Sequence, residues 1–364
     1  MSTIKRRDVL AGAAFAGLAA SSLPKPAYAT GKRKLKCVTT WPKNYPGLGM
    51  MPERVAQYVS DMTDGRITIK VHGAGEIVPA FESFDAVSRG TADMYHGAEY
   101  YWQGKSKGFN FFTAVPFGLT ANEQNAWIYY GGGQELWDSL SAKFNIKAFP
   151  AGNTGVQMGG WFAKEINSLD DWKGLKIRMP GIGGEVARRL GAAAVALPGG
   201  EIFPSLQSGA IDATEWVGPW NDLAFGFYKV VKNYYWPGFH EPGSTLALGI
   251  NLDLWNEFSK PDQAILQAAC AAVDSRSLAE YNMQNGRALK TLIEKHKVEL
   301  KRFPNDLLAS VGKVSGEVMR EAAAEDATVK EIFDSYLAAR TEVSEWSRIS
   351  EQAYWEARQL DYPY

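Results

Sequence analysis

A ten-residue pattern occurs twice in this chain and constrains its fold more than any other feature. Phe84–Asp93 and Phe203–Asp212 share the arrangement F-x-x-[VL]-x-x-G-x-x-D, and the second copy begins 119 residues after the first. In each copy the residues before the glycine suit a helix, the glycine suits its C-terminal cap, and a strand is expected to follow. Such junctions are common enough to arise twice by chance. We favour the alternative, in which the chain contains two similar α/β lobes.

The hydrophobic patterning elsewhere agrees with this fold class. It predicts a strand over residues 34–41, a helix over 52–62 and a second strand over 67–72, where Ile and Val alternate with Thr and Lys. Strands then alternate with helices up to about residue 250. That order predicts a mixed or parallel sheet flanked by helices.

The C-terminal part of the chain is expected to be helical from about Pro304 onward. Residues 329–358 contain no Gly or Pro and would extend about 45 Å as one helix. Apolar residues recur at spacings of three and four and form a stripe, which comprises Ile332, Phe333, Tyr336, Val343, Trp346, Ile349 and Ala353. A helix of this kind either wraps both lobes or packs on another subunit. We favour the second arrangement, which predicts a homodimer.

The first 29 residues are interpreted as an export signal. A basic start at residues 5–7 is followed by a short apolar run over 9–18 and by an A-x-A cleavage site at 27–29. The pair Arg6-Arg7 resembles a twin-arginine signal, and an ordinary secretory signal is the alternative. No later segment has 18 consecutive apolar residues. The mature protein is therefore expected to be soluble and periplasmic.

Charge and cysteine content exclude some classes of function. Without the signal the chain keeps 35 basic and 39 acidic residues, a net charge of −4, which argues against nucleic-acid binding. Cys37 lies in an apolar strand and Cys270 in an Ala-rich helix, so both are expected to be buried free thiols, although an oxidising compartment permits a disulfide. The histidines at positions 72, 96, 240 and 296 have no metal-ligand spacing.

Enzyme motifs are present only as fragments. The segment 104–108 matches G-x-S-x-G in its letters, but two lysines flank the serine and no strongly apolar strand precedes it. The segment 181–184 lacks the third glycine of a dinucleotide fingerprint, and neither CxxC nor HExxH occurs. We predict that the chain is not an enzyme, with a secreted enzyme as the distant alternative.

Two charged residues are expected at strand ends, where α/β sheets bind small ligands. Arg178 lies in the alternating segment 175–179, which Pro180-Gly181 ends, and Glu215 follows a strand predicted over 210–214. A guanidinium at a strand end suits bidentate binding of a carboxylate, although a surface or ion-paired arginine gives the same pattern. A carboxylate beside an anionic ligand needs a proton, an arginine or a cation. Gln157 offers a neutral oxygen, and this donor set suits Na⁺ or Ca²⁺ better than Zn²⁺.

Taken together, these segments resemble the extracytoplasmic solute-binding proteins of TRAP transporters, the tripartite ATP-independent periplasmic transporters of DctP type. The resemblance covers about residues 34–358. It is carried by the long C-terminal helix and by three segments, which are Trp172-Lys-Gly-Leu-Lys-Ile-Arg-Met-Pro180, Leu206-Gln-Ser-Gly-Ala-Ile-Asp212 and Ala86-Val-Ser-Arg-Gly-Thr-Ala-Asp93.

The resemblance implies a two-lobed α/β periplasmic binding protein of Venus-flytrap type. The first lobe would comprise 30–152 with part of 217–255, the second 153–216 with part of 256–328, and the helix 329–358 would form a swapped dimer. The chain is most similar to the subgroup that binds 2-oxo monocarboxylates, or lactate, with a metal ion. The expected partners are a small carboxylate and the membrane permease subunits.

The same resemblance implies roles for individual residues. Arg178 would pair with the substrate carboxylate, while Gln157, Glu215 and the Trp216 carbonyl would hold the cation. Further residues expected at the site are Asn153, Tyr100 and Tyr101 on the substrate side and Glu241 on the metal side. Arg178, Glu215 and a monocarboxylate sum to −1, which favours Na⁺; if Glu241 also lines the site, the sum favours Ca²⁺. The alternative within this class binds a dicarboxylate or a sugar acid without metal.

Overall fold

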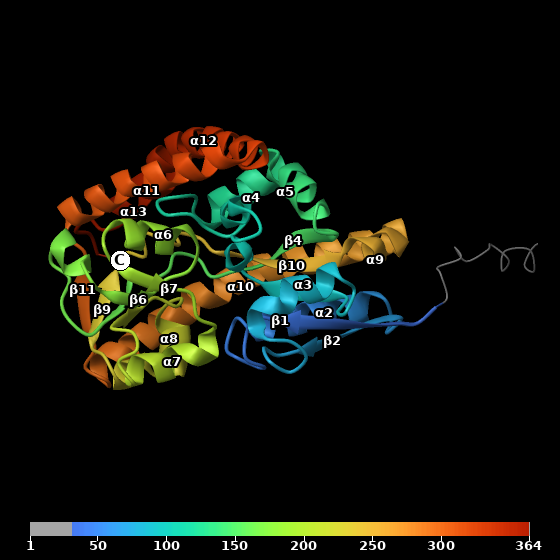
Figure 1. Cartoon of the computed structure of the whole chain (residues 1–364), viewed down its shortest axis with the longest axis horizontal. Coiled ribbons are helices and arrows are strands. Elements are labelled where there is room, and N and C mark those ends of the chain that lie inside the picture. The colour runs from blue at the N-terminus through green and yellow to red at the C-terminus, as the bar shows by residue number, and fades with distance from the viewer. Residues whose placement is uncertain (1–30, 364) are drawn as a thin grey trace, which may run out of the picture.

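The computed structural model describes residues 31–363 and contains two β-sheets with helices around them (Figure 1), which confirms the predicted α/β class. The predicted export signal lies outside the described residues. The strands of the first sheet, in spatial order, are β2 (Ile67–His72), β1 (Arg33–Thr39), β3 (Met94–Gly97), β10 (Thr245–Asn251) and β4 (Ile146–Asn153). Strand β1 runs parallel to β2 and β3, whereas β10 runs antiparallel to β3 and β4.

The second sheet is also mixed. Its strands, in spatial order, are β11 (Glu299–Arg302), β9 (Asn233–Trp236), β5 (Gly160–Phe162), β8 (Ala213–Thr214), β6 (Lys176–Arg178) and β7 (Ala193–Val195). Strand β6 is parallel to β7 and β8, and β5 is antiparallel to β8 and β9. We call each sheet with the helices packed on it a lobe, the first lobe being the one that contains β1.

Helices cover the sheets and join the lobes. The α-helices are α2 (Met50–Met62), α3 (Ser83–Ser88), α4 (Ala121–Tyr130), α5 (Gly133–Ala142), α6 (Gly181–Arg189), α7 (Gly199–Gln207), α8 (Pro219–Phe225), α9 (Leu252–Glu257), α10 (Lys260–Glu294), α11 (Asn305–Glu325), α12 (Ala327–Ser347) and α13 (Ala353–Ala357). The 35-residue α10 packs on β4 and α2 of the first lobe and on α8 of the second, so it ties the lobes together. No helix within residues 31–363 is long and apolar enough to cross a bilayer.

The repeated pattern forms the same local structure in both lobes. In each copy a helix, α3 or α7, ends before a glycine with positive φ, +75° at Gly90 and +74° at Gly209, and a strand follows. The aspartate of each copy accepts from a lysine backbone N–H on the neighbouring parallel strand, at 2.6 Å for Lys36 and 3.1 Å for Lys176. The Nζ of that lysine donates to a carbonyl just before the aspartate, at 2.8 Å and 2.6 Å. The two copies are therefore structurally equivalent, as predicted.

The C-terminal helix departs from the prediction in how it packs. Helix α12 begins at Ala327 and leads through a π-helical turn (Arg348–Gln352) into α13, so the helical path is not one regular helix. Phe333 and Tyr336 are buried against Phe111 of the first lobe, with ring centroids 5.9 and 5.3 Å from it, while α11 packs on α6 of the second lobe. The first half of the apolar stripe thus packs on its own chain, contrary to the interpretation we favoured.

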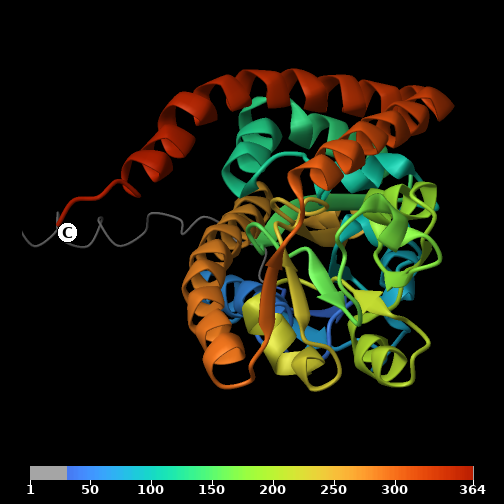
Figure 2. The ribbon, with the colours of Figure 1, turned by 90° about the vertical axis from the view of Figure 1, so that its left-hand side faces the viewer.

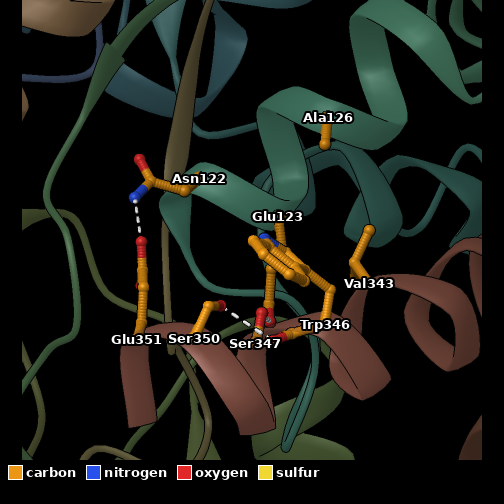
Figure 3. A pocket seen from close by; sticks show the side chains of 8 residues that line it. All are labelled: Asn122, Glu123, Ala126, Val343, Trp346, Ser347, Ser350 and Glu351. Atoms are coloured by element: carbon orange, nitrogen blue, oxygen red, sulfur yellow. Dashed lines mark hydrogen bonds between the residues drawn. The ribbon is translucent and has the colours of Figure 1, made fainter. Parts of the chain in front are cut away.

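Beyond that contact the helix extends away from both lobes (Figure 2). Near the end of α12 the chain is anchored on α4, where Ser347 donates to Glu123 at 2.6 Å and Asn122 donates to Glu351 at 3.2 Å (Figure 3). Trp346 lies in the same contact and is 67% exposed. Both cysteines are buried free thiols, as predicted.

Candidate binding site between the lobes

Arg178 and Glu215 lie at the ends of neighbouring parallel strands of the second sheet. Arg178 is the last residue of β6 and is in register with Thr214, the last residue of β8. Glu215 follows directly, and its backbone N–H donates to the Arg178 carbonyl at 3.2 Å. Both side chains are fully buried. Strand β8 is shorter than the predicted 210–214, but it ends at Thr214 as predicted.

The two side chains form a direct ion pair. Nη1 of Arg178 donates to Oε1 and, at 3.2 Å, to the backbone carbonyl of Glu215. Nε donates to the Leu197 carbonyl at 3.1 Å, and Nη2 donates to the Tyr101 hydroxyl at 3.3 Å. Burial alone would lower the pKa of Arg178, and the carboxylate of Glu215 reverses this, so the guanidinium stays charged. One N–H of Nη2 takes no part in these bonds and suits a ligand carboxylate.

The adjacent tyrosines occupy different positions at the site. Tyr101 contacts Arg178 through its hydroxyl, and burial raises the pKa of Tyr101 to about 12. Tyr100 packs against Gly181, whose φ is +63°; a Cβ there would lie 3.2 Å from the Tyr100 Cβ. Burial also raises the pKa of Tyr100, so both phenols are neutral, and it is Tyr101 that contacts Arg178.

His240 is a site residue that sequence reasoning missed. It lies in the segment between β9 and β10, and its Nε2 is 3.3 Å from Oε2 of Glu215. Glu215, His240 and Glu241 are all buried, and one potential ligand atom from each lies within 4.8 Å of the others. Burial, and then the charge of Glu215, raises the pKa of Glu241 to about 7. His240 has no ligand spacing with Glu215 in the sequence because only the folding of the second sheet joins the two segments.

The Gln157 amide is held with its oxygen free. Its Nε2 lies 2.8 Å from Oε2 of Glu241, 3.1 Å from the Thr154 hydroxyl and 3.1 Å from the Ser244 hydroxyl. The buried Oε1 has no hydrogen-bond partner among the described residues. A buried acceptor without a partner is costly, so this oxygen is suited to a ligand that the protein itself does not supply. Together with the carboxylates it forms a hard-oxygen donor set that fits Na⁺ or Ca²⁺.

Asn153 and Trp216 complete the set predicted from sequence. The Asn153 amide is engaged by its own surroundings, since Oδ1 accepts from Gly155 N at 2.8 Å and Nδ2 donates to Thr245 at 3.2 Å. It therefore fixes the turn that leads to Gln157. The Trp216 ring faces the Arg178 guanidinium, with 5.1 Å between the ring centroid and Cζ.

A pocket of about 520 Å³ lies beside this cluster and is lined by both lobes. Phe81, on its first-lobe side, packs on Tyr101 with ring centroids 4.6 Å apart and the rings tilted by 35°. Pro198, on its second-lobe side, follows the carbonyl that accepts from Arg178. The pocket is thus separated from the Arg178–Tyr101 contact by Phe81 on one side and by the Leu197–Pro198 segment on the other.

Known proteins with the same fold share this arrangement of lobes. The sequence pattern of the DctP family, the bacterial extracellular solute-binding proteins of family 7, matches residues 37–326. The chain is 43% identical over 319 residues to a monocarboxylate 2-oxoacid-binding periplasmic protein of a Nostoc species, across 88% of this chain and 87% of the relative.

Two solved TRAP periplasmic solute-binding proteins are similar in structure as well. One, from Pseudoalteromonas atlantica, holds sodium and pyruvate. It is 39% identical to this chain with a TM-score of 0.87, and the superposition covers 89% of this chain and 99% of that one. The other, from Colwellia psychrerythraea, holds calcium and pyruvate; its TM-score is 0.87 at 39% identity, covering 90% and 99%. The two-lobed architecture is confirmed by these similarities.

Proposed function

We propose that this chain, which belongs to the bacterial extracellular solute-binding proteins of family 7, binds a small 2-oxo or 2-hydroxy monocarboxylate together with Na⁺ or Ca²⁺. It is the solute-binding receptor of a TRAP transporter, and it delivers the acid to membrane permease subunits. The observation that carries the proposal is the buried cluster of Arg178, Glu215 and Gln157 at the cleft between the lobes.

Each residue of the cluster has a distinct role in this proposal. The free N–H of Arg178 and the Tyr101 hydroxyl hold the substrate carboxylate. Gln157 Oε1, Glu215 and the Trp216 carbonyl hold the cation, which supplies a positive charge that the acid's oxygens share. Glu241 accepts from the Gln157 amide N–H and so turns the amide oxygen toward the cation.

Charge explains why an acid and a cation would bind together. Arg178 and Glu215 cancel each other, so an added carboxylate leaves −1 in a buried site, and one added monovalent cation restores neutrality. Glu241 lies beside Glu215, so a charged Glu241 adds a further −1 to the site and favours Ca²⁺ over Na⁺.

A thermal-shift screen tests this function. Chelator-treated protein is mixed with pyruvate, lactate, succinate and galacturonate, each with and without Na⁺ or Ca²⁺. We expect the melting temperature to rise with a monocarboxylate plus cation, because a ligand that binds only the folded state stabilises it. Stabilisation by a dicarboxylate or sugar acid without metal would contradict the proposal, and NMR showing conversion of the bound acid would indicate an enzyme instead.

The exposed end of the C-terminal helix supports a homodimer. Trp346, Ile349, Tyr354 and Trp355 are 51–67% exposed along the path from α12 to α13, and Leu360 beyond α13 is 68% exposed, although large apolar residues rarely gather on a free surface. We propose that a second copy of the chain covers them. Light scattering of the full mature chain should give a dimer mass, and truncation after Ser347 should give a monomer; a monomeric full chain would overturn the proposal.

The proposed location is the periplasm. The predicted signal at residues 1–29 and the extracellular character of the family support it. Fractionation of cells that express the full chain should place the mature protein in the periplasmic fraction, and a lysine pair in place of Arg6-Arg7 should block export if the signal is of twin-arginine type. Unchanged export of that variant would indicate an ordinary secretory signal.

A further inference from the structure

A buried aspartate of the second lobe binds the peptide unit between Trp216 and Val217, just beyond Glu215. Asp222 lies in the first turn of α8 and is 1% exposed. Its Oδ2 accepts from the Trp161 indole at 2.9 Å and from the Tyr234 hydroxyl at 2.6 Å. Its Oδ1 accepts from the Val217 backbone N–H at 3.3 Å. The carboxylate therefore connects two strands of the second sheet, β5 and β9, to the backbone just beyond Glu215.

The Val217 N–H belongs to the same peptide unit as the Trp216 carbonyl. In a planar trans peptide the N–H and C=O point in opposite directions. With its N–H directed at Asp222, the unit turns the Trp216 carbonyl away from Asp222. The carbonyl of the next residue is fixed as well, because Met158 N donates to Val217 O at 3.1 Å. The peptide units on the two sides of the Val217 Cα are thus both held, the first by Asp222 and the second by Met158.

Asp222 is itself rigidly held. The Trp161 and Tyr234 rings stack with centroids 4.0 Å apart and an interplanar angle of 18°, so their two donors approach one carboxylate oxygen from a fixed platform. Next to Asp222, Asn221 contacts the first lobe by donating to the Pro46 carbonyl at 2.7 Å. The first turn of α8 is therefore fixed both within its lobe and across the cleft.

We infer that Asp222 is a positioning residue that aims the Trp216 carbonyl at the cation and strengthens it as a ligand. A carboxylate that accepts from the N–H of a peptide polarises that peptide and increases the negative charge on its carbonyl oxygen. The inference rests on the proposed function, in which that carbonyl is a cation ligand. Outer partners of this kind typically change metal affinity by about 10- to 100-fold.

The test is the cation dependence of acid binding. Pyruvate affinity is measured by calorimetry on chelator-treated protein over a series of Na⁺ and, separately, Ca²⁺ concentrations. For Asp222→Asn we expect the half-saturating cation concentration to rise about 10- to 100-fold, while the affinity at saturating cation returns to that of the wild type. Tyr234→Phe removes one of the donors that hold Asp222 and should give a smaller shift in the same direction. If Asp222→Asn does not fold, this second variant provides the test.

The chain offers a matched control in Glu99. This buried carboxylate also accepts from one tyrosine, Tyr95, and one tryptophan, Trp137, but it lies in the first lobe and bonds no predicted ligand residue. Glu99→Gln should change the melting temperature without moving the cation midpoint.

Unshifted midpoints in both Asp222→Asn and Tyr234→Phe would overturn the inference alone, as would affinity that saturating cation does not restore. If the pyruvate affinity of the wild type depends on neither Na⁺ nor Ca²⁺, the proposed cation site is overturned, and the inference with it.

Discussion

Substitution of Arg178 by alanine is the sharpest single test of the site. The side chain is fully buried, and its Nη1 is paired with Glu215. Truncating one partner of a buried charged pair costs about 2–5 kcal/mol of binding free energy, which is about a 30- to 4,000-fold loss of affinity for the acid. Calorimetry with pyruvate at saturating cation measures this loss. Affinity within a few-fold of wild type would refute the assigned role.

The same substitution also perturbs folding, and a second variant separates the two effects. Arg178→Ala leaves Glu215 buried with His240 as its remaining polar side-chain partner, a change that destabilises proteins by about 3–5 kcal/mol. Arg178→Ala combined with Glu215→Gln removes both charges, so its unfolding free energy should recover while pyruvate affinity stays low. Arg189→Ala is the control, because Arg189 forms an exposed pair with Glu321, and such pairs contribute about 1 kcal/mol or less.

Three further substitutions test other features. Gln157→Leu removes the unpartnered Oε1 and should raise the cation concentration needed for half-maximal binding by at least about tenfold; an unchanged midpoint in calorimetry would count against that ligand. Asn110→Ala removes the 3.0 Å bond by which Asn110 of the first lobe accepts from Ile182 N of α6 in the second. Because a cap contributes about 1 kcal/mol and this one joins the two lobes, we expect acid binding to weaken about fivefold; unchanged affinity would exclude a role in closure. Burial raises the pKa of Glu99 from 4.5 to about 7, so the native state keeps a proton that the unfolded state loses, and the contribution of Glu99 to stability should fall by about 3 kcal/mol as pH rises from 4.5 to 7. Urea titration should therefore find the pH-dependent loss of stability smaller by about this amount in Glu99→Gln than in the wild type; an equal loss in both would contradict the assignment.

The repeated lobes could be predicted because their signal is local. A glycine that must adopt positive φ, and an aspartate that accepts from the neighbouring strand, occur at fixed distances along the chain in both copies. Arg178 and Glu215 were predictable for a similar reason, since each follows a short apolar segment whose end is visible in the sequence. Parallel pairing of β6 and β8 then brings the two residues together.

The rest of the site depends on contacts between distant segments. Gln157 and Glu241 are 84 residues apart, and only their contact shows that the amide nitrogen is engaged while the oxygen is free. His240 gives no local signal at all, because its ligand-like geometry comes from the turn after β9. The apolar stripe of the C-terminal helix shows that a surface must be covered but does not identify what covers it, which is why the packing of Tyr336 on its own chain was not foreseen.

The buried ion pair has a thermodynamic consequence for how the site fills. Without ligand, Arg178 and Glu215 neutralise each other, so an acid that binds Arg178 would add an uncompensated negative charge beside the buried Glu215 carboxylate. A cation bound by Glu215 would offset that charge. Each ligand therefore raises the affinity for the other, and by linkage the two factors must be equal. Such coupling lets the lobes close on the pair of ligands in preference to either one alone, because only the pair leaves the buried site neutral.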